Sequence, residues 1–407
     1  MILGKKNFLN CIFAILIVFC SFCPALAIDE ISGTEEKTDG NEVIYLDVPK
    51  KDLKDVIADN ISKEDEKTDV VKKKKRQNFF NLFREKGYQF EKGPIKSQRI
   101  SFFTHGGVLM KAERNKDFLS KVDTPSNELL LSTQFADGKT SLEIAYNLSR
   151  SREHNSTFWG KFTAFEVIHK FNEHQTLRIG DTRLPNGYEG GSSSSLLHFI
   201  PRSQIAGNFG NGIAVAVRNQ GKYKYLDYDV ALSDGSRYLQ EMLGGAEVTA
   251  LASLKPLAKF NDKYGSLKIG GSIDHGRSHD MDFTVVGGHL MYKYKKFYWE
   301  TEYQYANNYA GTWYHRGKAH GLYSTVGYFV TPKTELVARY DLFQKLDNHN
   351  INTEYSVGLN YYITPVAKIM LNYILGKDDK KPAPVHRIFM GVDIKFYSLV
   401  DKIFENI

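Results

Sequence analysis

The feature that most constrains this chain is an alternation of apolar and polar residues, repeated in short segments from about residue 97 to residue 396. In "FYWETEYQY" (297–305), aromatic residues dominate the odd positions, whereas Glu300, Glu302 and Gln304 occupy even ones. Residues two apart on a strand lie on the same side, so each segment has one apolar and one polar face. The pattern predicts β-strands with unlike faces.

About sixteen such segments follow one another, near residues 104, 131, 145, 164, 179, 214, 229, 250, 269, 287, 301, 326, 339, 358, 371 and 391. The connections alternate in character. Tight turns at 331–333 and 364–366 contrast with long polar stretches at 307–321 and 376–385. Short turns at one rim and long loops at the other are typical of outer-membrane barrels. The fold class predicted is all-β, a transmembrane antiparallel β-barrel of about 16 strands over residues 97–396.

A soluble, secreted β-sandwich can show the same alternation and stays an alternative. A sandwich would turn its apolar faces inward, and would seldom carry aromatic residues at strand ends on both sides. Aromatic girdles are expected at both interfaces of a membrane barrel. Aromatic residues recur near predicted strand ends, at Trp299, Tyr305, Tyr340, Tyr361, Tyr373 and Phe396. These positions favour the membrane barrel, whose lumen at this strand number would hold water.

Residues 1–27 have the pattern of a secretory signal peptide, with a membrane anchor as the alternative. Lys5 and Lys6 precede an apolar run at 8–20, and Ala25 and Ala27 form a small-x-small cleavage site. All three cysteines lie in this leader, so the mature chain would contain none. That excludes a disulfide scaffold, a cysteine-ligated metal and a cysteine nucleophile.

Residues 28–96 are dense in Lys, Glu and Asp and are predicted to be a charged, partly disordered segment. An even strand number places both ends of a barrel on the periplasmic side, so this N-terminal extension is expected in the periplasm. The formal net charge of +7 falls to about +5 without the leader. So mild a charge on an exported chain argues against a nucleic-acid partner. Residues 397–407 are predicted to be a C-terminal tail.

The longest Gly- and Ser-rich break in the strand array is "LRIGDTRLPNGYEGGSSSSLLHFIPRSQIAG" (177–207). This segment resembles the region around the third loop of the phosphate-selective porin O and P family. Members carry R-x-G-x-x-x-x-P-F-G-x-E, then a Ser-rich stretch, then an aromatic residue with Glu-Arg. The matching positions are Arg178, Gly180, Pro185, Gly187, Glu189, Ser192 to Ser195, Phe199 and Arg202.

The sequence departs from this family pattern in three places. Asn186 replaces the expected Phe, and Pro201 replaces the expected Glu. Eleven further residues follow Phe396, where such barrels usually end on an aromatic residue. The resemblance implies a barrel of sixteen strands, usually a homotrimer, with the third loop folded into the lumen as a constriction. An ordinary exposed extracellular loop is the alternative, although long loops without structure of their own tend to be functional.

The charges near this loop supply the candidate site residues. Charge at the narrowest point sets the selectivity of a pore. The polar strand faces carry at least as many acids as bases, so only a local basic cluster could select anions such as phosphate. Solvated loop charges without a role in permeation are the alternative. The residues predicted to line the constriction are Arg178, Arg183, His198 and Arg202.

Signals of an enzyme are weak, so no catalytic activity, metal or cofactor is predicted. "GGSSSS" lacks the second Gly of a nucleophile elbow, because Ser194 occupies that position. His315 and His320 lack metal-ligand spacing and a carboxylate in register.

The function predicted is a porin of the bacterial outer membrane that lets small hydrophilic solutes, including candidate anions, diffuse passively. Its partners would be outer-membrane lipid, those solutes and other copies of the chain. Two alternatives stay open besides the soluble protein: a non-conducting barrel that acts as an adhesin or structural anchor, and an outer-membrane hydrolase that uses a loop serine.

Overall fold

The computed structural model describes residues 88–397, apart from 90–92, 115, 149–161, 211, 236–244, 279–280, 311–313 and 382. The predicted signal peptide (1–27), nearly all of the charged segment (28–96) and the tail beyond residue 397 lie outside the described residues. These assignments, and the segment boundaries, stay predictions.

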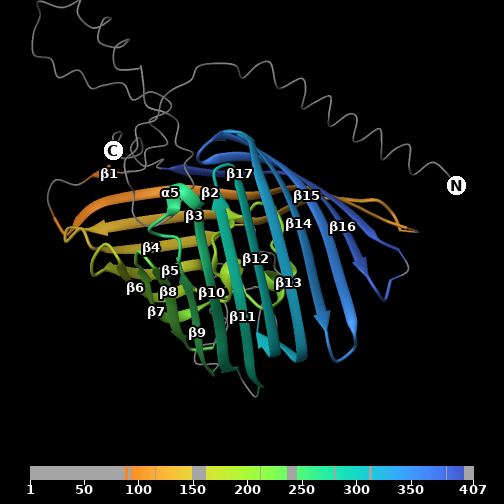
Figure 1. Cartoon of the computed structure of the whole chain (residues 1–407). Helices are drawn as coiled ribbons and strands as arrows, with labels where there is room; N and C mark the ends of the chain where they lie inside the picture. Colours follow the sequence, from red (N-terminus) through yellow and green to blue (C-terminus); the bar gives the residue numbers. More distant parts are fainter. Residues whose placement is uncertain are drawn as a thin grey trace, which may run out of the picture. The chain divides into compact units, whose positions relative to one another are not determined.

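Sixteen antiparallel strands form one closed barrel (Figure 1). Each strand pairs with the next along the chain, and β17 pairs back with β2, so the sheet has no open edge between them. A short β1 (Tyr88–Gln89) also pairs with β2. The barrel strands are β2 (Ile95–Glu113), β3 (Leu119–Phe135), β4 (Thr140–Asn147), β5 (Phe162–Lys170), β6 (Gln175–Arg183), β7 (Ile213–Lys222), β8 (Leu226–Ser233), β9 (Gly245–Leu254), β10 (Ser266–Ser278), β11 (Met281–Tyr294), β12 (Phe297–Ala310), β13 (Tyr314–Thr331), β14 (Thr334–Lys345), β15 (Asn350–Thr364), β16 (Ala367–Asp378) and β17 (Val385–Tyr397).

The predicted fold class is confirmed, and each of the sixteen predicted segment positions falls inside its strand. One predicted loop is wrong. Most of the stretch 307–321 belongs to strands, because β12 runs to Ala310 and β13 starts at Tyr314. Its polar residues extend the ladder past a bulge between Asn307 and Tyr309, where the Asn308 side chain accepts a hydrogen bond from the Gly317 amide. The polar residues of this stretch therefore belong to the parts of β12 and β13 that extend past the apolar outer surface, and they do not indicate a loop.

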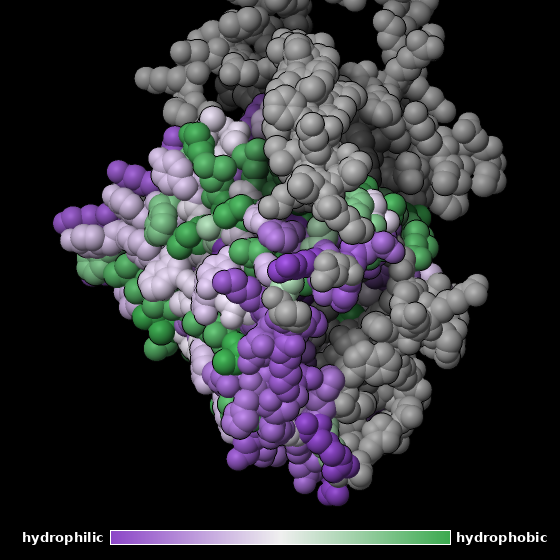
Figure 2. Space-filling view, turned by 90° about the vertical axis from the view of Figure 1, so that its right-hand side faces the viewer, coloured by the Kyte–Doolittle hydropathy of each residue, from purple (hydrophilic) through white to green (hydrophobic). Residues whose placement is uncertain are grey.

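The barrel is apolar outside and polar inside. On β12, Phe297 and Tyr303 are 39% and 45% exposed, whereas Glu302 and Gln304 are 2% exposed. Figure 2 shows hydrophobic residues spread over one side of the molecule, with hydrophilic residues gathered toward one end. A soluble sandwich would bury its apolar face, so this polarity excludes that alternative for the described barrel.

The two rims differ in the length of their connections. In outer-membrane barrels the rim with short turns faces the periplasm and the other faces outward. One rim carries connections 136–139, 171–174, 223–225, 255–265, 295–296, 332–333 and 365–366, with the short helix α5 (Asn261–Tyr264) inside the longest of them. The other carries connections 114–118, 148–161, 184–212, 234–244, 279–280, 311–313, 346–349 and 379–384. The rim that carries α5 and the short connections is therefore the periplasmic rim.

Candidate functional site

The connection between β6 and β7, residues 184–212, folds into the lumen and is called the inner loop below. Figure 1 shows its yellow-green turns within the barrel, behind β12 and β13. It contains α3 (Tyr188–Gly191), a 3-10 turn η4 (Ser194–Leu196) and α4 (Gln204–Asn208). Ser203 caps α4, because its hydroxyl accepts a hydrogen bond from the Ala206 amide at 3.3 Å. The loop thus brings its own short helices into a polar interior.

Apolar side chains in the second half of the inner loop hold it against the wall at two places. Ile205 and Phe209 are fully buried in a cluster with residues of β11–β14, namely Val285, Ala306, Tyr309, Ala319, Tyr323 and Phe343. Ile200 packs in a second cluster, with Leu109, Met370, Ile374 and Phe389 of β2, β16 and β17. Burial of each such side chain contributes roughly 1.5–3 kcal/mol. These contacts explain why a polar lumen contains apolar patches.

Acids and amides of the wall satisfy the backbone N–H groups of the loop. The Glu302 carboxylate accepts hydrogen bonds from the amides of Tyr188 (2.7 Å) and Glu189 (3.2 Å). Asp341 accepts one from the Gln204 amide at 2.8 Å. Asn372 accepts one from the Ile200 amide at 2.9 Å. Buried backbone groups need partners, so these wall residues stabilise the inward position of the loop.

Wall donors satisfy the carbonyl groups in the same way. Lys368 donates to the carbonyl of Leu197 at 2.6 Å, and Asn360 to that of His198 at 2.9 Å. Arg339 donates to the carbonyl of Pro201 at 3.2 Å, and its guanidinium stacks 4.6 Å from the ring centroid of Phe199. Pro201, a departure from the family pattern, therefore still provides a carbonyl anchor.

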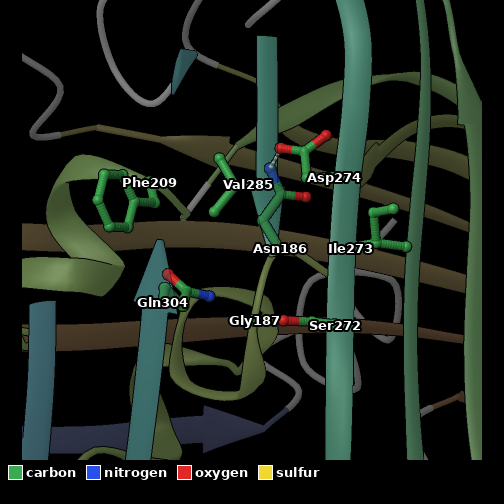
Figure 3. A pocket seen from close by; sticks show the side chains of 8 residues that line it. All are labelled: Asn186, Gly187, Phe209, Ser272, Ile273, Asp274, Val285 and Gln304. Atoms are coloured by element: carbon green, nitrogen blue, oxygen red, sulfur yellow. Dashed lines mark hydrogen bonds between the residues drawn. The ribbon is translucent and has the colours of Figure 1, made fainter. Parts of the chain in front are cut away.

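Asn186, the other departure within the loop, also has a defined partner. Its amide donates to Asp274 of β10 at 2.9 Å (Figure 3). The neighbouring Gly187 has a φ of 74°, and a Cβ there would collide with Glu302 and Gln304. The crevice between this turn and the wall is too narrow to hold a water molecule and is lined by Asn186, Gly187, Phe209, Ser272, Ile273, Asp274, Val285 and Gln304. Loop and wall therefore contact each other closely at this turn.

His198 is held in a buried polar network. Its ring stacks on Tyr298, with 4.4 Å between centroids, and its Nδ1 lies 2.8 Å from Glu335. Its Nε2 lies 3.7 Å from Glu300. Burial lowers the pKa of His198, but the nearby carboxylates of Glu335 and Glu300 outweigh it and raise the pKa to about 10. At neutral pH His198 is therefore a cation that ties the inner loop to β14.

The other three predicted constriction residues have separate environments. Arg178 belongs to β6, where it donates to Glu166 at 2.6 Å and to Gln220 at 2.9 Å. Arg183 ends β6. Arg202 lies in the loop and donates to the carbonyls of Glu189 (2.5 Å) and Ser192 (2.7 Å). Two of the four predicted residues are thus in the loop and two are in the adjoining strand.

Arg218 of β7 was missed in the sequence. It lies opposite Arg178 in the register and makes two hydrogen bonds to Asp229, at 2.8 and 2.5 Å. The alternation of Ala216, Arg218 and Gln220 on one strand face could have identified it. Arg178 and Arg218 are neighbouring cations on the lumen wall, each with an acid beside it.

The loop serines are used locally. Ser192 donates to the carbonyl of Tyr188 at 2.7 Å, and Ser193 caps η4 through the Ser195 amide. Within the described residues, no group of three or more His, Cys, Asp or Glu side chains is placed to hold a metal ion.

Comparison with known proteins relates the chain to one family. The model of the phosphate-selective porin O and P family matches residues 264–389. This match and the sixteen-stranded barrel support an outer-membrane porin that is similar to this family over the matched residues. The match runs from the end of α5 into β17, which is the wall that holds much of the inner loop, and the loop itself lies outside the matched range. The predicted family resemblance and location in the bacterial outer membrane are confirmed.

Solved structures similar to this porin share its fold at low sequence identity. An anion-selective porin from Comamonas acidovorans is 11% identical with a TM-score of 0.54, over 74% of this chain and 99% of that one. The outer membrane channel DcaP of Acinetobacter baumannii is 12% identical with a TM-score of 0.52, over 76% and 99%. A loop L8 deletion mutant of OmpT of Vibrio cholerae is 12% identical with a TM-score of 0.52, over 74% and 99%. No curated protein sequence matches this porin.

Proposed function

We propose that this porin is a passive diffusion channel for small hydrophilic solutes, and that the inner loop is its constriction. The observation that carries the proposal is the position of the loop. Buried hydrogen bonds join it to β2, β10, β12 and β14–β16, as described for Asp274, Glu302, Asp341, Asn360 and Lys368, and His105 of β2 bonds to the Ile200 carbonyl at 2.9 Å. A loop fixed inside a sixteen-stranded barrel narrows an otherwise open aqueous lumen.

The conducting path would lie between the inner loop and the wall of β4–β9. That wall presents Arg178, whose side chain is 26% exposed, and the Arg218–Asp229 pair. The exposed residues Ser193 and Leu196 belong to the loop and would face this path. A hydroxyl-rich edge beside paired charges suits solvated solutes in general.

The ion preference should be weak. Lumen cations lie beside acids in several places, for example Arg178 by Glu166 and Arg387 by Glu354, the latter at 2.5 Å. Arg202 lies within the inner loop itself, where it donates to the carbonyl groups of Glu189 and Ser192 and to the Ser194 hydroxyl. Since charge at the narrow point sets selectivity, we assign the pore a small preference for anions, and Arg202 is the arginine of the inner loop that tests it.

Planar-bilayer recording tests the proposal. Purified protein should form ohmic channels, and the reversal potential in a salt gradient should show weak anion selectivity. Arg202→Ala should move that potential toward cation selectivity. Arg277→Ala is the matched control, because Arg277 is exposed outside the lumen beside Asp282. Insertion without conductance would contradict the channel and would favour the adhesin or structural anchor instead. A cation-selective wild type would contradict the anion preference.

Two further predictions belong to this proposal. Assembly into a homotrimer, implied by the family resemblance, would appear as three equal conductance steps per insertion and as a trimer after chemical cross-linking. The family and the fold are those of channels, and the expected lack of catalytic activity stays a prediction.

A further inference from the structure

Three neighbouring turns of the periplasmic rim are rich in lysine. They are residues 222–225, 255–265 and 293–297, together called the basic rim below. Asp262 is the one acid in these segments. Their lysines are Lys222, Lys224, Lys255, Lys259, Lys263, Lys293, Lys295 and Lys296.

The barrel brings these turns side by side. They connect β7–β8, β9–β10 and β11–β12, and the pairs β8–β9 and β10–β11 join them. Backbone and side chain link them directly: the Lys255 amide donates to the Tyr225 carbonyl at 2.8 Å. Tyr292, the β11 residue directly before the third turn, donates from its hydroxyl to the Tyr264 carbonyl at 2.8 Å. The three turns therefore form one continuous surface.

Exposed aromatic rings alternate with the lysines on this surface. Tyr225, Phe260 and Tyr264 are each about half exposed, at 50%, 51% and 48%. Lysine ammonium groups lie 4.9–5.9 Å from ring centroids in the pairs Lys224–Tyr225, Lys259–Phe260, Lys263–Tyr264 and Lys295–Tyr294. Aromatic rings and lysines whose stems cover apolar surface are both typical of the membrane–water interface.

Among the connections of β7–β12, the excess of lysine is confined to the basic rim, and the basic rim adjoins the apolar outer wall of the barrel. In the sequence, the stretches 234–244, 279–280 and 311–313, which follow β8, β10 and β12, contain Asp234, Glu241 and Asp280 against a single Arg237. Immediately beyond the basic rim, the outer wall exposes apolar side chains, with Leu226, Leu254 and Ile269 at 36%, 61% and 44%. The lysines therefore lie where headgroups of the periplasmic leaflet meet the acyl chains.

We propose that the basic rim binds the anionic headgroups of phospholipids in the periplasmic leaflet. Phosphate oxygens would accept hydrogen bonds from the exposed ammonium groups of Lys224, Lys259, Lys263, Lys295 and Lys296, while the rings of Tyr225, Phe260 and Tyr264 rest at the level of the glycerol esters. A zwitterionic headgroup carries no net charge to attract these lysines, so the surface discriminates by charge. The partner is a phospholipid of the phosphatidylglycerol type, concentrated on one side of the barrel.

The test compares lipid retention by two variants with five substitutions each. Full-length protein in neutral detergent is given equal amounts of phosphatidylglycerol and phosphatidylethanolamine, and bound lipids are counted by native mass spectrometry. The rim variant has Lys224, Lys259, Lys263, Lys295 and Lys296 changed to Gln. The matched control has Lys116, Lys318, Lys345, Lys380 and Lys381, at the opposite rim, changed to Gln. Heat-modifiable migration verifies that each barrel is folded.

Wild type and the control should prefer phosphatidylglycerol, and the rim variant should lose at least about tenfold of that preference, since each lysine near an anionic surface contributes attraction. Changing the same five lysines to Arg should preserve it. In the wild type alone, raising NaCl from about 0.05 M to about 0.5 M should reduce the preference by screening, which tests the proposal even if the rim variant does not fold.

Equal retention of both lipids by the wild type would overturn the proposal, as would equal losses in the rim and control variants. Displacement of phosphatidylglycerol by millimolar inorganic phosphate would overturn the assignment to lipid and indicate a site for soluble anions. Conductance is recorded on the same samples, so that failure of lipid binding is distinguishable from failure of the channel.

Discussion

The two halves of the barrel use the same polar lumen face in different ways. In β10–β16, lumen side chains such as Glu302, Asp341 and Lys368 bond to the inner loop and are buried. In β5–β8, Arg178 and Arg218 bond instead to acids and amides of neighbouring strands. The first half therefore holds the inner loop through these side chains, and the second half would line the proposed solute path. A polar strand face can thus bind the inner loop where the loop lies against it, or contact water where it does not.

The largest effect is expected from Phe209→Ala, which tests whether the first half holds the loop. Phe209 is fully buried against Tyr309 and Phe343, and truncation of such a ring costs roughly 3–5 kcal/mol. The inner loop should leave the wall more often, giving larger and noisier single-channel conductance and faster amide exchange in the loop. Val217→Ala, on the exposed outer face of β7, is the control and should change neither. Unchanged noise and exchange in Phe209→Ala would contradict this role of the apolar cluster.

Glu302→Ala should have the next largest effect. It removes the acceptor of the Tyr188 and Glu189 amides, and a buried donor left without a partner costs about 1–3 kcal/mol. Limited proteolysis should then cut the loop near α3, and conductance should fluctuate. Glu143→Ala, on β4 in the other half, should leave proteolysis unchanged. If both substitutions had the same effect, the difference between the halves would disappear.

Alkaline pH should loosen the loop through His198. The folded-state pKa of about 10 is above the ordinary value of 6.5. The stabilisation is therefore fully present below pH 6.5, and is lost as the pH rises through about 10. Channel noise should increase over this window as the attraction to Glu335 and Glu300 is lost. His198→Gln should remove the pH dependence in this window, and a wild type insensitive to it would contradict the role of the cation.

The smallest effect is expected from Asp229→Asn in the lining half. It leaves Arg218 without its carboxylate partner, so the reversal potential should move modestly toward anion selectivity, while the inner loop stays in place. Asp341→Asn, in the holding half, should instead increase channel noise with little change in selectivity. If Asp341→Asn changed the selectivity and Asp229→Asn increased the channel noise, solutes would pass on the other side of the loop.

Most of the fold was predictable, because each strand has its own alternation of apolar and polar residues. The stretch 307–321 was misread as a loop because polar residues also occur where strands extend past the apolar belt. The inner loop was located by its Gly- and Ser-rich composition and its resemblance to a porin loop. The roles of Arg178 and Arg202 were not predictable, because their partners Glu166 and the Glu189 carbonyl are set by register and by loop folding.

The basic rim was not predictable from the sequence either. Lys224, Lys259 and Lys295 are far apart in the sequence, and no local pattern marks them as one surface. By itself, the sequence determined the strands, their order and their two unlike faces, because side-chain direction in a strand depends on local geometry alone. The closed barrel decided which polar residues hold the inner loop, which line the lumen and which lysines meet at the rim, because these contacts join strands that are distant along the chain.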